Sequence, residues 1–321
     1  MNLTLSDILS ARRRIAPHVV RTPLRRSEWL SRSTGGEVFL KLESLQPTNS
    51  FKIRGAFNAA LIHCSSGPGS TGAPIITASA GNHGRALAYA GERLGFRPIV
   101  YAPETAPRAK LDAIRAHGAD LRLSRDYDEA ETQAKAHAAS GAGIWLSPFS
   151  HPDIVSGAAT IGLEIAEDLP DVDVVVVPVG GGGLISGIGI AIKAIAPRVE
   201  IVGVEVEASH PFTDGLAAGR IVPITVGPSL ADGLVGNLDP DTITFDLARR
   251  VVDRFVLVGE DDLVAGLCGL VASEHLVAEG AGIAAIAAAL AGKVAVEGRR
   301  AVVILSGANI DLERLRQVLR C

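Results

Sequence analysis

Short apolar runs alternate along the chain with longer amphipathic segments. Residues 174–177 (Val-Val-Val-Val) and 302–305 (Val-Val-Ile-Leu) are continuous apolar runs of strand length. Such runs are typical of parallel strands that are buried on both faces. The pattern predicts strands at 37–42, 74–77, 97–101, 119–122, 172–177, 200–206, 251–258 and 301–305. It predicts helices at 5–15, 52–63, 82–94, 107–116, 126–139, 152–168, 184–196, 260–275 and 280–291.

Strands that alternate with helices indicate an α/β fold with mainly parallel sheets. Ser65 to Gly72 has the composition of a linker, and Pro148 to Pro152 is a second crossing between lobes. Two crossings imply two parallel-sheet domains, the smaller inserted into the larger. We expect a small domain at residues 73–149 and a large, discontinuous domain at residues 1–72 and 150–321. A ligand would bind in the cleft between them.

Lys52 lies where a turn-rich segment, residues 46–50, gives way to a helical run. The positive end of the helix dipole and partial burial both favour the neutral amine. A neutral lysine is a nucleophile that can form a Schiff base. Taken alone, the segment fits a surface lysine at a helix start equally well, so the rest of the chain has to decide.

Four consecutive glycines, Gly180 to Gly183, follow a predicted buried strand and precede an apolar helical run that begins at Leu184. In this arrangement main-chain N–H groups and the helix N-terminus cradle a phosphate. A flexible turn and a nucleotide-binding loop are the alternatives. No Lys-Ser or Lys-Thr follows, and a G-x-G-x-x-G match is uninformative among glycines this dense. The loop predicts a site for one phosphate group.

Two further turns follow predicted strands. Residues 79–83 (Ser-Ala-Gly-Asn-His) open a helix whose N-terminus suits a carboxylate. Asn82 is also a candidate N-cap of that helix. His83 is a candidate general base, but we favour a residue that only hydrogen-bonds locally. Ser306 reaches a glycine turn at the carboxyl end of a strand, where open α/β sheets bind ligands.

Together these motifs resemble those of pyridoxal-phosphate enzymes with the tryptophan-synthase-β-like fold (fold type II), in the branch of threonine dehydratases and serine racemases. The resemblance runs from about Ile15 to the end of the chain, with the motifs in the family's order. The matching segments are Ser50–Gly55 (Ser-Phe-Lys-x-Arg-Gly), Ser79–His83 (Ser-x-Gly-Asn-His), Gly180–Gly183, and Ser306–Asn309 (Ser-Gly-x-Asn), with Thr22–Leu24 and Lys41–Glu43 as early landmarks.

The resemblance implies a role for each matched position. Lys52 would form the Schiff base with pyridoxal 5'-phosphate and later move protons. Phe51 would pack on the cofactor ring, Asn82 would bond its phenolic oxygen, and Ser306 would bond its pyridine nitrogen. The phosphate would be held by Gly180, Gly181, Gly182, Gly183 and Leu184. The substrate carboxylate would be held by Ser79, Ala80, Gly81, Asn82 and His83.

Two positions depart from the family pattern. Racemases of this branch have a second serine after the one that matches Ser79, and it acts on the cofactor face opposite the lysine. Here that position is Ala80, which cannot donate a proton, so the sequence favours elimination over racemisation. The family often has Gly-Gln-Gly-Thr where this chain has Gly157-Ala158-Ala159-Thr160, and the effect on the site stays open.

A cation site is less well defined. Some relatives bind a divalent cation through a glutamate after the strand at 200–206, and Glu205 or Glu207 fits that place. The second acidic ligand would fall on Pro211 or Thr213, although Asp214 is close, and a hard cation needs several oxygen ligands. A divalent or monovalent cation therefore stays open, with no ligands named. Charges at a strand end explain these residues at least as well.

Composition narrows the classes of partner. At 321 residues and a formal net charge of -4, the chain has no basic surface signature for nucleic acid. The longest apolar run, residues 281–291, is too short to span a membrane. Cys64, Cys268 and Cys321 are too widely spaced for a disulfide framework or a zinc pattern. Residues 1–14 contain no secretory apolar region, so a cytoplasmic location is expected.

These observations predict a pyridoxal-phosphate-dependent ammonia-lyase that dehydrates and deaminates a β-hydroxy amino acid, giving a 2-keto acid and ammonia. Threonine or serine is the expected substrate. The alternatives are another hydroxylated amino acid (phenylserine, 3-hydroxyaspartate or a hydroxyectoine breakdown product), a serine racemase, or a ligand-binding regulatory module without chemistry. We expect a homo-oligomer, either dimer or tetramer. Because the chain ends soon after Ser306, we expect no regulatory extension of the biosynthetic threonine dehydratase kind.

Overall fold

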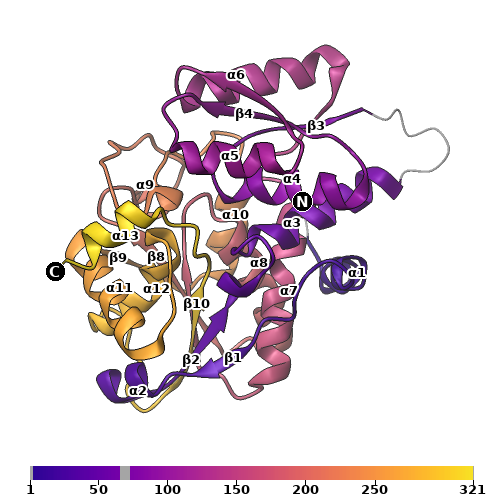
Figure 1. Cartoon of the computed structure of the whole chain (residues 1–321). Helices are drawn as coiled ribbons and strands as arrows, with labels where there is room; N and C mark the ends of the chain where they lie inside the picture. The colour runs from indigo at the N-terminus through magenta and orange to yellow at the C-terminus, as the bar shows by residue number, and fades with distance from the viewer. Residues whose placement is uncertain (1–2, 66–72, 321) are drawn as a thin grey trace.

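Two mainly parallel sheets organise the chain (Figure 1). The computed structural model describes residues 3–65 and 73–320. In the described part of the chain, the strand order is β1-β2-β10-β7-β8-β9 in the six-stranded sheet and β5-β4-β3-β6 in the four-stranded sheet. The smaller sheet is built from one continuous stretch of sequence, so it interrupts the chain of the larger one. This confirms the expected α/β fold with an inserted small parallel sheet.

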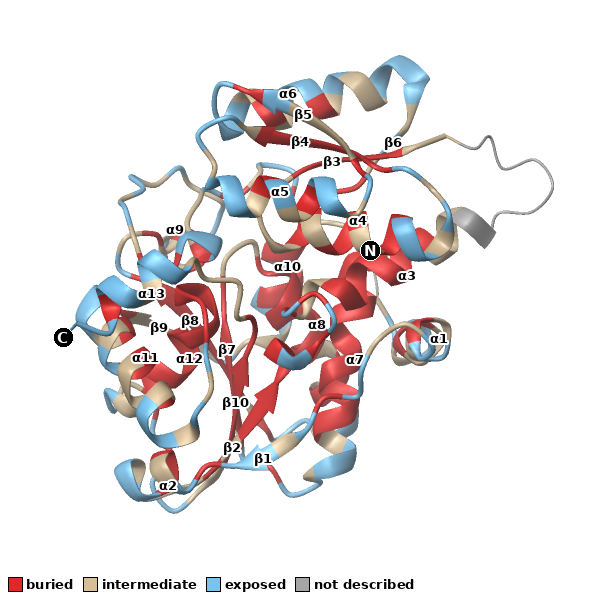
Figure 2. Ribbon diagram, viewed as in Figure 1, coloured by how far each residue is buried: buried red, intermediate tan, exposed pale blue. Residues whose placement is uncertain are grey.

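The six-stranded sheet is parallel except for β1, which pairs antiparallel with β2. Successive residues of its central strands face opposite layers. Val174 and Val176 pack with α11 and α12, whereas Val175 and Val177 pack with α7 and α8. Figure 2 shows the central strands buried and the flanking helices only partly buried. The strands are β1 (Leu24–Arg26), β2 (Glu37–Leu42), β7 (Val174–Pro178), β8 (Glu200–Val206), β9 (Arg254–Val258) and β10 (Arg300–Leu305).

The four-stranded sheet is wholly parallel among the described residues. Helix α6 covers one of its faces, and α4 and α5 lie on the other side (Figure 1). Its strands are β3 (Ile75–Ala78), β4 (Ile99–Pro103), β5 (Asp120–Ser124) and β6 (Ile144–Trp145), and its helices are α4 (Asn82–Leu94), α5 (Arg108–Ala116) and α6 (Tyr127–His137).

The remaining helices surround the larger sheet and connect the two units. Helix α3 lies between them, because it packs against both α4 and α7. These helices are α1 (Leu5–Ile15), α2 (Glu28–Thr34), α3 (Lys52–Ser65), α7 (Pro152–Asp168), α8 (Gly183–Ile195), α9 (Pro211–Ala218), α10 (Ile243–Val251), α11 (Glu260–Glu274), α12 (Gly280–Leu290) and α13 (Leu312–Val318).

All predicted strands and helices are present, but six short elements were missed: β1, β6, α2, α9, α10 and α13. The two missed strands have three and two residues, too few to show alternation. The strand predicted at 251–258 is partly wrong, because Val251 ends helix α10 and β9 begins at Arg254. Val251 and Val252 are β-branched, like Val256 and Val258 of the strand that follows, so composition alone does not assign them to the helix.

Strands β3 to β6 fall within the range expected for the small domain, and the six-stranded sheet falls outside it. The exact domain boundaries stay a prediction. Apart from Ser65, the linker expected at Ser65 to Gly72 lies outside the described residues. Among the helices that the structure describes, none combines the length and apolarity needed to cross a membrane.

Candidate active site

Lys52 is the first residue of α3 and lies half-buried between the two sheets. Its Nζ donates a 2.8 Å hydrogen bond to the main-chain oxygen of Pro148 and lies 5.1 Å from the centre of the Phe51 ring. Burial lowers the pKa of Lys52 to about 8, and the charge of Glu279 opposes this shift. A lysine with this pKa supplies the neutral amine at a much lower pH than an exposed one.

A small cavity lined in part by Lys52 brings three predicted segments together: the lysine segment, the crossing that begins at Pro148, and the end of the glycine loop. Ala158, at the position where this chain departs from the family pattern, also lines it, so that departure lies next to the lysine. A larger cavity between α1, α7 and α10 contains none of the predicted site residues. The lining residues of the small cavity are Phe51, Lys52, Gly55, Pro148, Ile154, Ala158, Gly183 and Leu184.

The tetraglycine loop joins β7 to the N-terminus of α8, as the sequence predicts. Gly182 has φ +80°, a left-handed conformation that favours glycine. A Cβ atom on Gly181 would lie 2.3 Å from Cγ of Phe149, and one on Gly182 would lie 2.4 Å from Cζ of Phe212. The loop is held from outside by Thr244, whose Oγ1 donates a 2.7 Å hydrogen bond to the oxygen of Gly181. Side chains are therefore excluded from this helix N-terminus.

Ser306 follows β10 and is buried directly beside the lysine segment. Its main-chain oxygen accepts a 3.0 Å hydrogen bond from the N–H of Phe51. The next residues of the two segments also pair, because Ser50 and Gly307 form an isolated β-bridge. Segments more than 250 residues apart in sequence are thus fixed to each other at the carboxyl edge of the large sheet.

Residues 79–81 form the turn between β3 and α4, and residues 82–83 begin α4. Gly81 is the N-cap of α4 and Asn82 its first residue, so the N-cap role considered for Asn82 does not apply. His83 is buried, and neither ring nitrogen has a hydrogen-bond partner among the described residues. The local hydrogen bond that we favoured for His83 is therefore wrong. Burial, and then the charge of Lys52, lower its pKa to about 3, so the ring is neutral.

Glu279 is the site residue that the sequence reading missed. It is buried at the start of α12, and its Oε1 accepts a 2.6 Å hydrogen bond from Nδ2 of Asn82. Burial raises the pKa of Glu279 to about 7, and Asp232 adds to the rise. The available signal was a lone charged residue at the beginning of an apolar Gly/Ala-rich run. An acidic residue at that place is as often an exposed charge that stabilises the helix N-terminus as it is a site residue.

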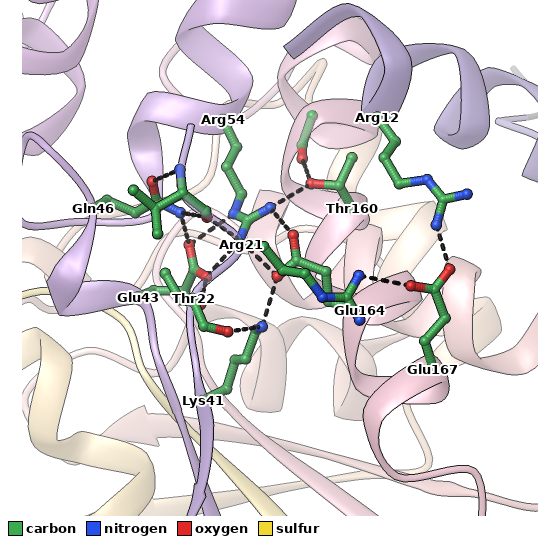
Figure 3. A network of polar contacts seen from close by, with 12 residues as sticks. Arg12, Arg21, Thr22, Lys41, Glu43, Gln46, Arg54, Thr160, Glu164 and Glu167 are labelled. Atoms are coloured by element: carbon green, nitrogen blue, oxygen red, sulfur yellow. Dashed lines mark hydrogen bonds and ion pairs between the residues drawn. The ribbon is translucent and has the colours of Figure 1, made fainter. Parts of the chain in front are cut away.

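A buried ionic network holds α3, and with it Lys52, in place (Figure 3). Arg54 donates to both oxygens of Glu43 at 2.8 Å and to the two oxygens of Glu164 at 2.6 and 2.9 Å. Lys41 adds a 2.6 Å hydrogen bond to Glu164 and one to the oxygen of Thr22. Thr22, Lys41, Glu43 and Arg54 belong to the family segments found in the sequence, whereas Glu164 does not. The network ties α3 to β2 and α7.

The carboxylate of Glu205 accepts three hydrogen bonds from the start of α9. Its oxygens accept from the N–H groups of Phe212 and Thr213 at 2.8 and 2.9 Å, and from Oγ1 of Thr213 at 2.6 Å. Glu205 therefore caps the N-terminus of α9. Among the described residues, no group of three or more His, Cys, Asp or Glu side chains is placed to hold a metal ion.

Comparison with known proteins agrees with this geometry. The family model described as "Pyridoxal-phosphate dependent enzyme" matches residues 15–307. The chain is 40% identical to the L-threonine ammonia-lyase of Thermotoga maritima, over 99% of this chain and 78% of that one. The processed form of threonine deaminase isoform 2 from Solanum lycopersicum superposes with a TM-score of 0.90 at 34% identity, covering 98% of this chain and 91% of that one. Maize serine racemase superposes with a TM-score of 0.91 at 29% identity, covering 100% and 98%.

The residues present fit pyridoxal phosphate. The glycine loop at the start of α8 leaves no room for side chains and suits a phosphate. Lys52 has the lowered pKa that Schiff-base formation needs, and Phe51 lies next to it. Ser50 and His83 have buried polar atoms without partners among the described residues, as expected near a group that brings its own polar atoms.

Proposed function

We propose that this chain, which belongs to the family of pyridoxal-phosphate dependent enzymes, is an ammonia-lyase that acts on a β-hydroxy amino acid. The substrate loses its α-proton and β-hydroxyl as water, and the product hydrolyses to a 2-keto acid and ammonia. L-Threonine and L-serine are the substrates of first choice. The observation that carries the proposal is the Lys52 amine, with a pKa of about 8, beside the tetraglycine loop.

Pyridoxal phosphate supplies a sink for the electron pair left on the substrate α-carbon. The neutral amine of Lys52 then takes the α-proton. N–H groups of Gly180 to Gly183 would hold the phosphate, with Leu184 next to them in the first turn of α8. The hydroxyl of Ser306 would bond the pyridine nitrogen, and a hydroxyl supports a protonated ring less strongly than a carboxylate. This suits elimination, because the electrons leave at once with the β-hydroxyl.

The substrate carboxylate would bind at Ser79, Ala80, Gly81, Asn82 and His83. These residues are the turn before α4 and the first two residues of that helix, whose N-terminal N–H groups favour an anion. A Cβ on Gly81 would meet nothing within 4 Å, so the turn has open space beside it. The buried, neutral His83 adds no charge to this subsite.

Three further features complete the proposal and rest on family membership. The enzyme acts in the cytoplasm and assembles as a homo-oligomer, a dimer or tetramer. A divalent or monovalent cation is an optional addition. Glu205 is unsuited to it, because main-chain N–H groups of α9 already occupy its carboxylate.

A serine racemase is the second candidate, and the superposition with maize serine racemase favours it. Ala80 argues against it, because a methyl group cannot deliver a proton to the face opposite Lys52.

The decisive test is to incubate purified protein and pyridoxal phosphate with a panel of β-hydroxy amino acids, and to measure keto acid and ammonia. We expect equal amounts of both products from L-threonine or L-serine. Activity only on a bulkier member of the panel would keep the reaction and change the substrate. Cofactor bound without any turnover across the panel would favour a ligand-binding module.

A further inference from the structure

The side-chain amide of Asn82 lies between two side chains that come from loops of the six-stranded sheet. Its Nδ2 donates to Oε1 of Glu279 at 2.6 Å, and its Oδ1 accepts from Nδ2 of Asn309 at 2.6 Å. Asn82 itself begins α4 of the smaller unit. These two hydrogen bonds therefore join the two units at the site and also constrain the rotation of the amide.

Asn309 has only one amide orientation that satisfies its partners. Its Oδ1 accepts from Nη1 of Arg85 at 2.6 Å, and its Nδ2 donates to the oxygen of Thr48 at 2.9 Å. A guanidinium can only donate and a carbonyl can only accept, so exchanging the oxygen and nitrogen of Asn309 would break both bonds. Nδ2 of Asn309 therefore meets Oδ1 of Asn82, and the nitrogen of Asn82 points to Glu279.

The side chain of Glu279 is buried and held in place by the residues around it. Its side chain is 6% exposed, and its N–H donates to the oxygen of Gly307 at 3.2 Å. A Cβ on Gly307 would lie 2.0 Å from Oε1 of Glu279, so a glycine beside Ser306 leaves the room that the carboxylate occupies. The charged groups that act on it are Lys52, Lys110 and Asp232. Burying a carboxyl here is costly unless it is hydrogen-bonded, and Asn82 provides that bond.

We infer that Glu279 is a positioning residue, which holds the amide of Asn82 so that the second N–H of Nδ2 is free to donate to the phenolic oxygen of the cofactor. Nδ2 carries two hydrogens, and Glu279 accepts only one of them. Without Glu279, Nδ2 of Asn82 loses the acceptor that fixes its direction. The inference deepens the proposed function and rests on it.

A double-mutant cycle on the holoenzyme tests this relationship. The variants are Glu279→Ala, Asn82→Ala and both together, and the readouts are the dissociation constant for pyridoxal 5'-phosphate and the absorption maximum of the lysine-bound cofactor. Glu279→Ala is expected to weaken cofactor binding about 10- to 100-fold, as for loss of a charge-assisted hydrogen bond, and to shift the absorption maximum. When Asn82 is already alanine, Glu279→Ala should change the dissociation constant for pyridoxal 5'-phosphate less than about twofold.

Two companion variants separate positioning from general damage to the fold. Glu279→Gln keeps an oxygen acceptor and should restore the absorption maximum, whereas Glu297→Ala removes an exposed carboxylate elsewhere and should change nothing. If Glu279→Ala does not fold, Glu279→Asp takes its place in the cycle. It keeps the carboxyl group but shortens the reach to Asn82, and the same pattern of losses is expected.

Equal losses of affinity in both backgrounds would show that Glu279 acts independently of Asn82 and would overturn the inference. An unmodified protein that never forms the lysine-bound absorption band would instead overturn the proposed function. A normal band that does not respond to Glu279 variants would overturn the positioning role alone.

Discussion

The Nζ atom of Lys52 donates a 2.8 Å hydrogen bond to the main-chain oxygen of Pro148. Lys52 begins α3, and Pro148 lies where the chain returns from the four-stranded sheet to the six-stranded one. The amine is therefore held at the junction of the two units, close to Phe149, whose ring contacts the glycine loop. Burial at this junction is the main reason for its lowered pKa.

Replacing Lys52 with alanine should remove both turnover and the near-visible absorbance of the bound cofactor. The proton-transfer group and the attachment point are lost together, so we expect a fall in rate of more than about 10³-fold. Lys293→Ala is the control, because that lysine pairs with Asp262 outside the site. Full activity of the Lys52 variant, with cofactor attached to another lysine, would refute the assignment.

Replacing Gly181 with aspartate should weaken cofactor binding about 10- to 100-fold. The new Cβ would meet the Phe149 ring at 2.3 Å, and the carboxylate would repel a phosphate. Equilibrium dialysis with pyridoxal phosphate measures the effect.

Gly227→Asp is the matched control for the glycine loop. A Cβ there would lie 3.6 Å from Ala208, an ordinary contact, and the charge change is the same. If Gly181→Asp and the unmodified protein bind pyridoxal phosphate with equal affinity, the glycine loop does not hold the phosphate.

The sequence predicted the elements that carry the site because each has a strong local signal. The valine run of β7, the four glycines and the apolar face of α8 all follow from steric rules that act within a few residues. Glu279 could not be found this way, because its partner Asn82 is 197 residues away. Only the folded arrangement of α4 and α12 reveals that the carboxylate belongs to the site.

Lys41, Glu43 and Arg54 show a second limit of sequence reasoning. The sequence showed them as part of the family resemblance. It did not predict that they are buried, because charged residues are mostly exposed. The structure buries all three: Lys41 and Arg54 pair with Glu164, and Arg54 also pairs with Glu43. Which charges meet in the core depends on how β2, α3 and α7 pack, and no local pattern encodes that packing.

Arg54→Met should lower the free energy of unfolding by about 3–5 kcal/mol, because it leaves Glu43 and Glu164 buried with fewer partners. Urea titration of the cofactor-free protein measures this change. Arg249→Met removes an exposed arginine paired with Asp246 and should cost at most about 1 kcal/mol. An equal effect of the two substitutions would contradict the structural role of the buried network.

Glu279 should give the cofactor-free protein a characteristic pH dependence. Burial raises the pKa of its carboxyl from an ordinary value of 4.5 to about 7, so folding favours the protonated form. Its contribution to stability is complete below pH 4.5 and is lost as the pH rises through 7, a loss of about 3 kcal/mol. Glu279→Gln does not titrate, so the difference in unfolding free energy between the two proteins should change by this amount. Parallel curves from pH 4.5 to 8 would exclude the raised pKa.

The last prediction is that the enzyme eliminates far faster than it racemises, and it depends on Ala80. Racemisation requires a proton delivered to the face opposite Lys52, and a positioned acid is typically worth ~10²–10⁴-fold in rate. Ala80 has no group to deliver that proton, whereas elimination requires only removal of the α-proton by Lys52 and departure of the β-hydroxyl. Keto acid and D-amino acid should be measured together from L-serine and L-threonine. Keto acid is expected to dominate.

Ala80→Ser tests the same point in the opposite direction. Ala80 is half-buried between Ser79 and Gly81, and a Cβ on Gly81 would meet nothing within 4 Å, so the turn has space for an added hydroxyl. The hydroxyl should raise the share of D-amino acid among the products, whereas Ala138→Ser, at the C-cap of α6, should leave it unchanged. If the unmodified protein forms D-serine as fast as pyruvate, another residue supplies the proton. His83 would then be the next group to replace, because it is buried near Lys52 and neither ring nitrogen has a partner among the described residues.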